Sequence, residues 1–129
     1  MRFLSIYKTV EKNSPPTAEE MATMGRLIEE AMKEGWLLET EGCLPSALGA
    51  RIRSDGTRIS VTDGPFAESK ELVGGFAILK ANSKAEAVEL CKRFLQVAGE
   101  GECELRQLYE AGVDATCVNQ AEPDVVVKA

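Results

Sequence analysis

The sequence contains no histidine among its 129 residues. This absence removes the commonest general base, the serine–histidine and cysteine–histidine nucleophile pairs, and the usual catalytic zinc ligand. No apolar run approaches the roughly 20 residues that cross a membrane. The N-terminal residues turn polar too early for the apolar core of a secretory signal. We therefore expect a cytoplasmic protein without histidine-based chemistry.

Basic residues are also scarce, since 15 Lys and Arg face 21 Asp and Glu and give a net charge of −6. Nucleic-acid surfaces need clustered Lys and Arg to neutralise phosphates. The only local concentration is Arg51, Arg53 and Arg58, which indicates a solvated strand face or an anion pocket. We predict that the protein binds neither nucleic acid nor a membrane.

The four cysteines are scattered and form no Cys-x-x-Cys pair; they are Cys43, Cys91, Cys103 and Cys117. Their number alone leaves an all-cysteine zinc site open, but zinc motifs usually pair cysteines at close spacing. Reduced, mostly buried thiols are the interpretation we favour.

The Gly74-Gly75 pair lacks the lysine of a phosphate-binding loop. We predict no metal and no cofactor.

Two capping boxes predict helices. Thr17 and Glu20 open the first, which continues as a stripe of Met, Leu, Ile and Ala at helical spacing until Gly35. The methionines of this stripe are expected to pack in the core or at a subunit interface. Ser83 and Glu86 form the second box, and its helix closes near Gly99.

Apolar and alternating runs predict the strands, which begin near Phe3, Trp36, Arg51, Arg58, Gly74 and Glu104. The first is expected to be buried on both faces. The third and fourth form a hairpin across Asp55-Gly56.

The order of these elements suggests an α+β fold of the ferredoxin-like split βαβ type, in which two helices cover one face of an antiparallel sheet. The other face needs a cover, and a homodimer is the simplest one. We expect one domain over residues 1–111. Residues 112–129 are expected to form a loosely held tail or an added edge strand at Val125–Val127.

The segment from Thr62 to Glu71 combines an acid, a Gly-Pro turn, an aromatic ring and alternating charges. Asp63 can cap a turn through backbone N–H groups, or serve as a general base or ligand anchor at a strand end. Phe66 is expected to anchor the loop in the core. Gly74-Gly75 permits close approach by a ligand, or a bulge beside a site.

Other charged residues complete this candidate site. Glu68 and Lys70 have either surface roles or ligand contacts. If the ligand is an anion, the positive counterpart would come from Arg51, Arg58 or Arg106.

Residues 61–76 resemble the signature of the DGPF-domain family, a branch of the YCII-related proteins. Residues 39–45 and 104–110 resemble further family segments, so the resemblance covers about residues 1–111. It implies a dimeric α+β barrel. Related proteins are suspected enzymes because a His-Asp pair lines a cleft. In this chain Asp63 would be the aspartate of that pair, while Met24 or a neighbour lies where the histidine would be. Catalysis by the pair is therefore excluded, but ligand binding is not.

Two functions follow from these observations. The first is binding of a small molecule in a cleft near Asp63, with enzymatic activity left open. The second is a regulatory or interaction module that acts with an extracytoplasmic-function sigma factor, because members of the DGPF branch are often encoded beside such factors. The acidic dimer surface and the tail from Gly112 would then contact the partner.

Overall fold

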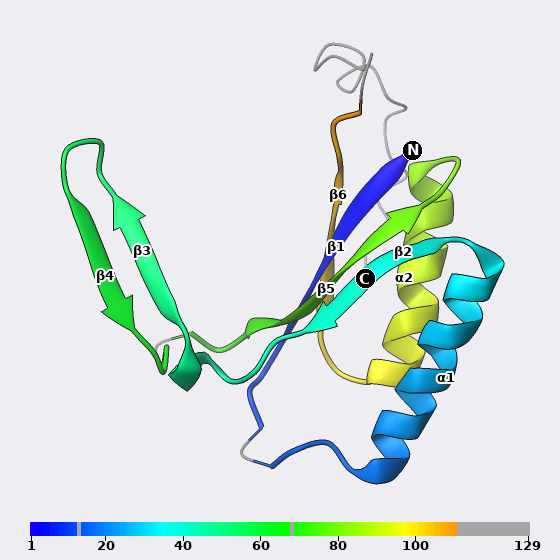
Figure 1. The fold of residues 1–129 in the computed structure, drawn as a ribbon, viewed down its shortest axis with the longest axis horizontal. Coiled ribbons are helices and arrows are strands. Elements are labelled where there is room, and N and C mark those ends of the chain that lie inside the picture. Colours follow the sequence, from blue (N-terminus) through cyan, green and yellow to red (C-terminus); the bar gives the residue numbers. More distant parts are fainter. Residues whose placement is uncertain (13, 68, 111–129) are drawn as a thin grey trace.

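The computed structural model describes residues 1–12, 14–67 and 69–110. Figure 1 shows the helices and strands of this part of the chain. In chain order they are β1 (Arg2–Thr9), α1 (Ala18–Glu34), β2 (Leu37–Gly42), the short 3-10 helix η1 (Ser46–Leu48), β3 (Ala50–Ser54), β4 (Ile59–Asp63), β5 (Leu72–Lys80), α2 (Lys84–Ala98) and β6 (Glu102–Gln107).

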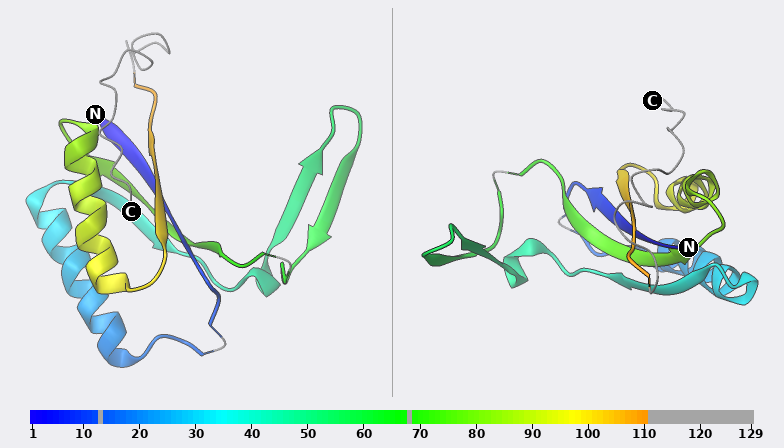
Figure 2. Two further views of the ribbon diagram at one scale, coloured as in Figure 1. Left: turned by 180° about the vertical axis from the view of Figure 1, so that it is seen from behind. Right: turned by 90° about the horizontal axis from the view of Figure 1, so that it is seen from above.

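The main sheet has four strands in the order β2-β5-β1-β6, and every neighbouring pair is antiparallel. Helix α1 connects β1 to β2 and α2 connects β5 to β6, and both helices lie on the same face of the sheet (Figures 1 and 2). The α+β split βαβ fold is therefore confirmed, with a hairpin inserted between β2 and β5. Among the residues that the structure describes, no helix or strand covers the other sheet face, and the dimeric barrel stays a prediction.

Both predicted helices form, but only the first capping box is complete. Thr17 Oγ1 accepts from the Glu20 backbone N–H, and the Glu20 carboxylate accepts from the Thr17 N–H, each at 3.1 Å. Gly35 ends the helix at a φ of +86°. Ser83 Oγ accepts from the Glu86 N–H, whereas the Glu86 carboxylate accepts from the Asn82 side chain. The second box is thus half formed, since the Glu86 carboxylate bonds to the Asn82 side chain and not to the Ser83 N–H.

The core lies between the sheet and the helices. It contains Phe3, Leu37 and Leu79 from the strands, Ala81 just after β5, and Ala31, Ala87, Leu90 and Cys91 from the helices. The expectation that β1 is buried on both faces is wrong for the part of the chain that the structure describes. Phe3 and Ser5 face the helices and are buried, but Leu4 and Ile6 on the uncovered face are only half-buried.

The inserted hairpin of β3 and β4 projects from the body on the side opposite the helices (Figures 1 and 2). Its turn is the predicted one, because the Asp55 carboxylate accepts from the backbone N–H groups of Thr57 and Arg58, and Gly56 has a φ of +101°. An isolated two-stranded hairpin is only marginally stable in water.

Neither helix in the described part of the chain is long and apolar enough to cross a membrane.

Candidate functional site

The Asp63–Phe66 segment joins the hairpin to the body by docking on η1. The Gly64 N–H donates to the Gly49 carbonyl at 3.0 Å, and the Phe66 N–H donates to Ser46 Oγ at 3.2 Å. A Cβ at position 64 would lie 1.7 Å from the Ser46 carbonyl oxygen. Only glycine fits there, so this part of the motif has a structural explanation.

Phe66 does not anchor the loop in the core, as the sequence suggested. Its ring is half-buried at the base of the hairpin, where the Arg51 guanidinium lies 4.0 Å above the ring centroid. Arg51 also donates to Ser69 Oγ at 3.0 Å. The hairpin base lies away from the helices, so a cation–π contact covers the ring instead of the core.

Asp63 is exposed at the end of β4. Its carboxylate makes no hydrogen bond or ion pair with any residue that the structure describes, so the predicted Asx turn is not formed. Ala50 pairs with Asp63 and Arg51 pairs with Thr62. Because side chains alternate across a strand, Arg51 and Asp63 point to opposite faces of the hairpin.

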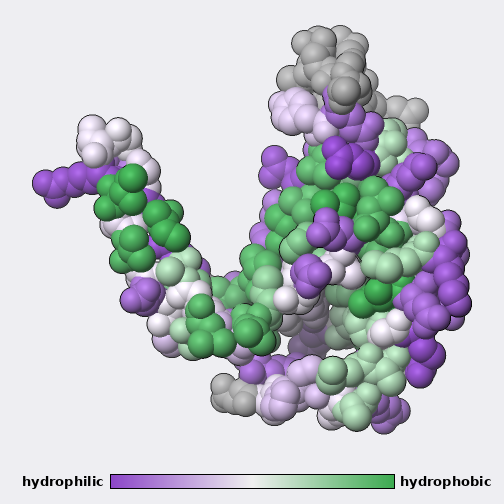
Figure 3. Space-filling model, viewed as in Figure 1, coloured by the Kyte–Doolittle hydropathy of each residue, from purple (hydrophilic) through white to green (hydrophobic). Residues whose placement is uncertain are grey.

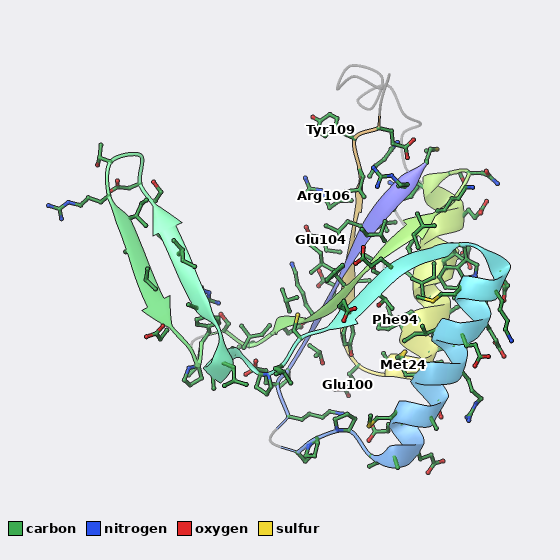
Figure 4. The ribbon with its side chains drawn as sticks, in the orientation of Figure 1. Met24, Phe94, Glu100, Glu104, Arg106 and Tyr109 are labelled. Carbon is green, nitrogen blue, oxygen red and sulfur yellow. The ribbon has the colours of Figure 1, made fainter. Side chains whose placement is uncertain are left out.

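The remaining predicted site residues are dispersed. Arg58 lies in the turn at the far end of the hairpin, and Lys70 is exposed in the loop before β5. Arg106 lies on the uncovered face of β6, where it pairs with Glu104 at 3.4 Å (Figure 4). Glu68 lies outside the described residues. Asp63 and these partners therefore stay predictions, and within the described chain they do not converge on one point.

A cavity lies elsewhere, between the helices and the sheet. It has a volume of about 470 Å³, and its walls include Met24 and Gly25 from α1 and Phe94 from α2. Figure 4 shows Met24 and Phe94 close together between the two helices and the sheet. The molecular surface is hollowed at this end, beside the loop from β1 to α1 (Figure 3).

Most polar groups in the cavity wall already have partners. Ser5 Oγ accepts from Cys91 Sγ at 3.5 Å, and Thr40 Oγ1 donates to the Phe76 carbonyl at 2.9 Å. The Glu20 carboxylate accepts the Thr17 backbone N–H, and this bond lowers the pKa of Glu20. A molecule in the cavity would therefore meet mainly apolar surface.

Gly74 and Gly75 form a bulge beside this cavity, which is one of the two roles that the sequence suggested. The pairing of β1 with β5 shifts between Tyr7 and Lys8, and Gly74 is the extra residue. A Cβ at Gly75 would lie 2.7 Å from the Glu41 carbonyl oxygen. The close approach is thus made by the backbone of β2. Both glycines line the cavity.

Gly25 is a cavity residue that the sequence reasoning missed. It lies in the interior of α1, away from either cap, and a Cβ there would have no atom within 4 Å. Glycine inside a helix costs about 0.5–1 kcal/mol relative to alanine. A glycine within a methionine stripe, far from any turn, was the signal that could have revealed it.

Fold and cavity define a ferredoxin-like α+β domain with a pocket between its helical layer and its sheet. A family model described as the YCII-related domain matches residues 1–112. The chain therefore belongs to the YCII-related family, and the match agrees with the resemblance seen over residues 1–111. No curated protein is similar enough to match the chain.

Proposed function

We propose that this chain binds a small, largely apolar molecule in the cavity between its helices and its sheet, and that it does so as a homodimer. The cavity carries the proposal, because its volume of about 470 Å³ falls within the range of about 300–1,000 Å³ typical of small-molecule sites. Its wall also has the composition of such sites, which are mostly apolar with a few polar groups.

Gly25 supports this proposal. Alanine would fit at this position and would favour the helix, yet glycine keeps that part of the wall open. Met21 and Met24 lie beside it in the cavity wall. Methionine adapts to the shape of what it contacts, and it is common at surfaces that accept varied apolar ligands. A wall of this kind favours binding over tight internal packing.

The hairpin supports the homodimer. Residues on alternate positions form its apolar face, which we define as Ile52, Ile59 and Val61, with exposed fractions of 68%, 74% and 64%. The uncovered face of the main sheet has a second apolar area at its centre: Leu4, Ile6, Phe76 and Ile78.

Figure 3 shows open space between the hairpin and the body, with apolar side chains on both sides of it. Two such areas on one small chain favour an isologous interface, in which a second copy covers both.

The predicted role of Asp63 is compatible with this arrangement. The side chains of Asp63 and Val61 point to the same face of the hairpin, so Asp63 lies at the base of the apolar hairpin face. A ligand site at Asp63 would therefore need surface from the second copy. For the ligand of the cavity we propose binding, and enzymatic activity stays open. The alternative role with a sigma factor depends partly on residues 112–129, which lie outside the described residues, and it stays a prediction.

The cavity can be tested with anilinonaphthalene sulfonate, a fluorescent apolar probe. Gly25→Leu places a branched side chain into the cavity and should abolish the gain in probe fluorescence. Gly25→Ala is the matched control, since it adds one methyl group and should keep most of the binding. Met32→Ser removes exposed apolar surface outside both the cavity wall and the hairpin face, and it should also keep the binding.

Circular dichroism should show that each variant is folded. Unchanged probe affinity in a folded Gly25→Leu protein would contradict the cavity site. If Asp63→Asn abolished binding while Gly25→Leu did not, the site would lie at the hairpin base instead.

A further inference from the structure

Two cysteines and a serine form a cluster beside the cavity. Cys91 on α2 is 8% exposed, and its Sγ donates to Ser5 Oγ at 3.5 Å. Ser5 is 7% exposed and is the only buried polar residue in the described part of the chain. Cys103 on β6 pairs with Tyr7, so it faces the helices on the same side as Ser5 and packs against the core. Its thiol interacts with both Cys91 and Ser5.

The two thiols influence each other. The interaction with Cys103 lowers the pKa of Cys91 to about 7, and the same interaction raises the pKa of Cys103. One thiolate is stabilised by the neighbouring S–H and by the Ser5 hydroxyl, while a second negative charge beside it is opposed. The pair can thus carry one negative charge near neutral pH, and a thiolate is the reactive form of cysteine.

A small molecule can reach the pair from the cavity, because Cys91 and Ser5 both line its wall. We propose that Cys91 and Cys103 form an oxidisable dithiol, which a hydroperoxide converts into an internal disulfide between α2 and β6. This reaction uses the opening of the cavity but does not require the ligand proposed above. It also adds a reaction to the reduced, mostly buried thiols that the sequence suggested.

The chemistry proceeds in two balanced steps. The Cys91 thiolate attacks the terminal O–H oxygen of the hydroperoxide, so an S–O bond forms and Cys91 becomes a sulfenic acid. The O–O bond breaks, and the leaving alkoxide oxygen takes a proton to give an alcohol. The Cys103 sulfur then attacks the Cys91 sulfur, which forms the S–S bond and breaks the S–O bond, and water leaves with the thiol proton. The two thiols lose two electrons, which reduce the peroxide.

The full chain carrying Cys43→Ser and Cys117→Ser tests the proposal, since it keeps only the two clustered cysteines. After treatment with cumene hydroperoxide we expect both free thiols to be lost and the intact mass to fall by two hydrogen atoms. Peptide mapping should find the Cys91 peptide joined to the Cys103 peptide within one chain, and dithiothreitol should restore both thiols. A gain of oxygen atoms without this cross-link would overturn the proposal, as would a disulfide found only between chains.

The matched controls keep one thiol each, through a further Cys91→Ser or Cys103→Ser change. Each should gain oxygen or a dimedone adduct instead of losing hydrogen. If a control fails to fold, the peptide map of the parent protein still decides between an internal cross-link and separate oxidation. Loss of probe binding in the cavity experiment would leave this outcome unaffected, so the two proposals fail separately.

Discussion

Replacing two side chains of the apolar hairpin face tests the homodimer most directly. Ile52 and Ile59 lie on that face, with exposed fractions of 68% and 74% in the single chain. They make few contacts within their own chain, so a double change to serine should leave the folded body intact. The double change removes apolar surface that, in our proposal, is buried only when a second copy is present.

The size of the effect follows from these exposures. Fully burying such a side chain is worth about 1.5–3 kcal/mol, and roughly two-thirds of that would be gained on association. Binding costs absorb part of the gain, so we count about 1 kcal/mol for each substituted residue. A dimer contains each residue twice, which gives about 4 kcal/mol, or a loss of about a thousandfold in dimer affinity.

Sedimentation equilibrium over a range of concentrations measures this change. The unsubstituted protein should sediment with twice the mass of one chain, and the double variant should shift to one chain. Arg53→Ser is the matched control, because Arg53 lies on the opposite, polar face of the same hairpin. Equal dissociation constants for the control and the double variant would refute our assignment of the interface.

Two further predictions concern the ends of the hairpin. Gly64→Ala should break the docking on η1, because its Cβ would lie 1.7 Å from the Ser46 carbonyl oxygen. The loss of two hydrogen bonds, worth about 2 kcal/mol, should speed amide hydrogen exchange at positions 64 and 66. Gly49→Ala is the control and should leave this exchange unchanged, since its Cβ would lie 3.5 Å from the same oxygen. Backbone N–H groups of Arg58 and Thr57 lower the pKa of Asp55, so its contribution to hairpin stability is present above its ordinary pKa and is lost as the pH falls through the lower folded value. Carboxyl chemical shifts measured by NMR during an acid titration would show this, and a midpoint at or above the ordinary pKa would contradict it.

The parts of the fold that could be predicted from the sequence depend on neighbours in the chain. The Thr17–Glu20 box, the Gly35 cap and the Asp55-Gly56 turn are each completed within a few residues. The order of the elements then leaves few sheet topologies for a chain of this length, and the split βαβ arrangement was one of them. Local signals and connectivity were enough for these features.

The parts that could not be predicted depend on what arrives from elsewhere in the chain. Glu86 was expected to bond back to the N–H of its own cap, but its carboxylate accepts from the Asn82 side chain instead. Phe66 was expected in the core, but the hairpin base lies away from the helices, and Arg51 covers the ring. The cavity at Gly25 arises from five separate elements, β1, α1, β2, β5 and α2, so no single segment of sequence displays it.

The Asp63–Phe66 segment shows why a motif can be recognised before its role is understood. Gly64 has a structural role because it allows the close approach of η1, and Phe66 has one because the Arg51 guanidinium packs on its ring. The Asp63 side chain has none within the described chain: it is exposed, and its carboxylate makes no hydrogen bond or ion pair with a described residue. A residue at the base of an unpartnered apolar face needs a second surface before it can bind anything. The homodimer experiment therefore comes before any assay of Asp63, because a protein that stays monomeric would remove the surface on which a site at Asp63 depends.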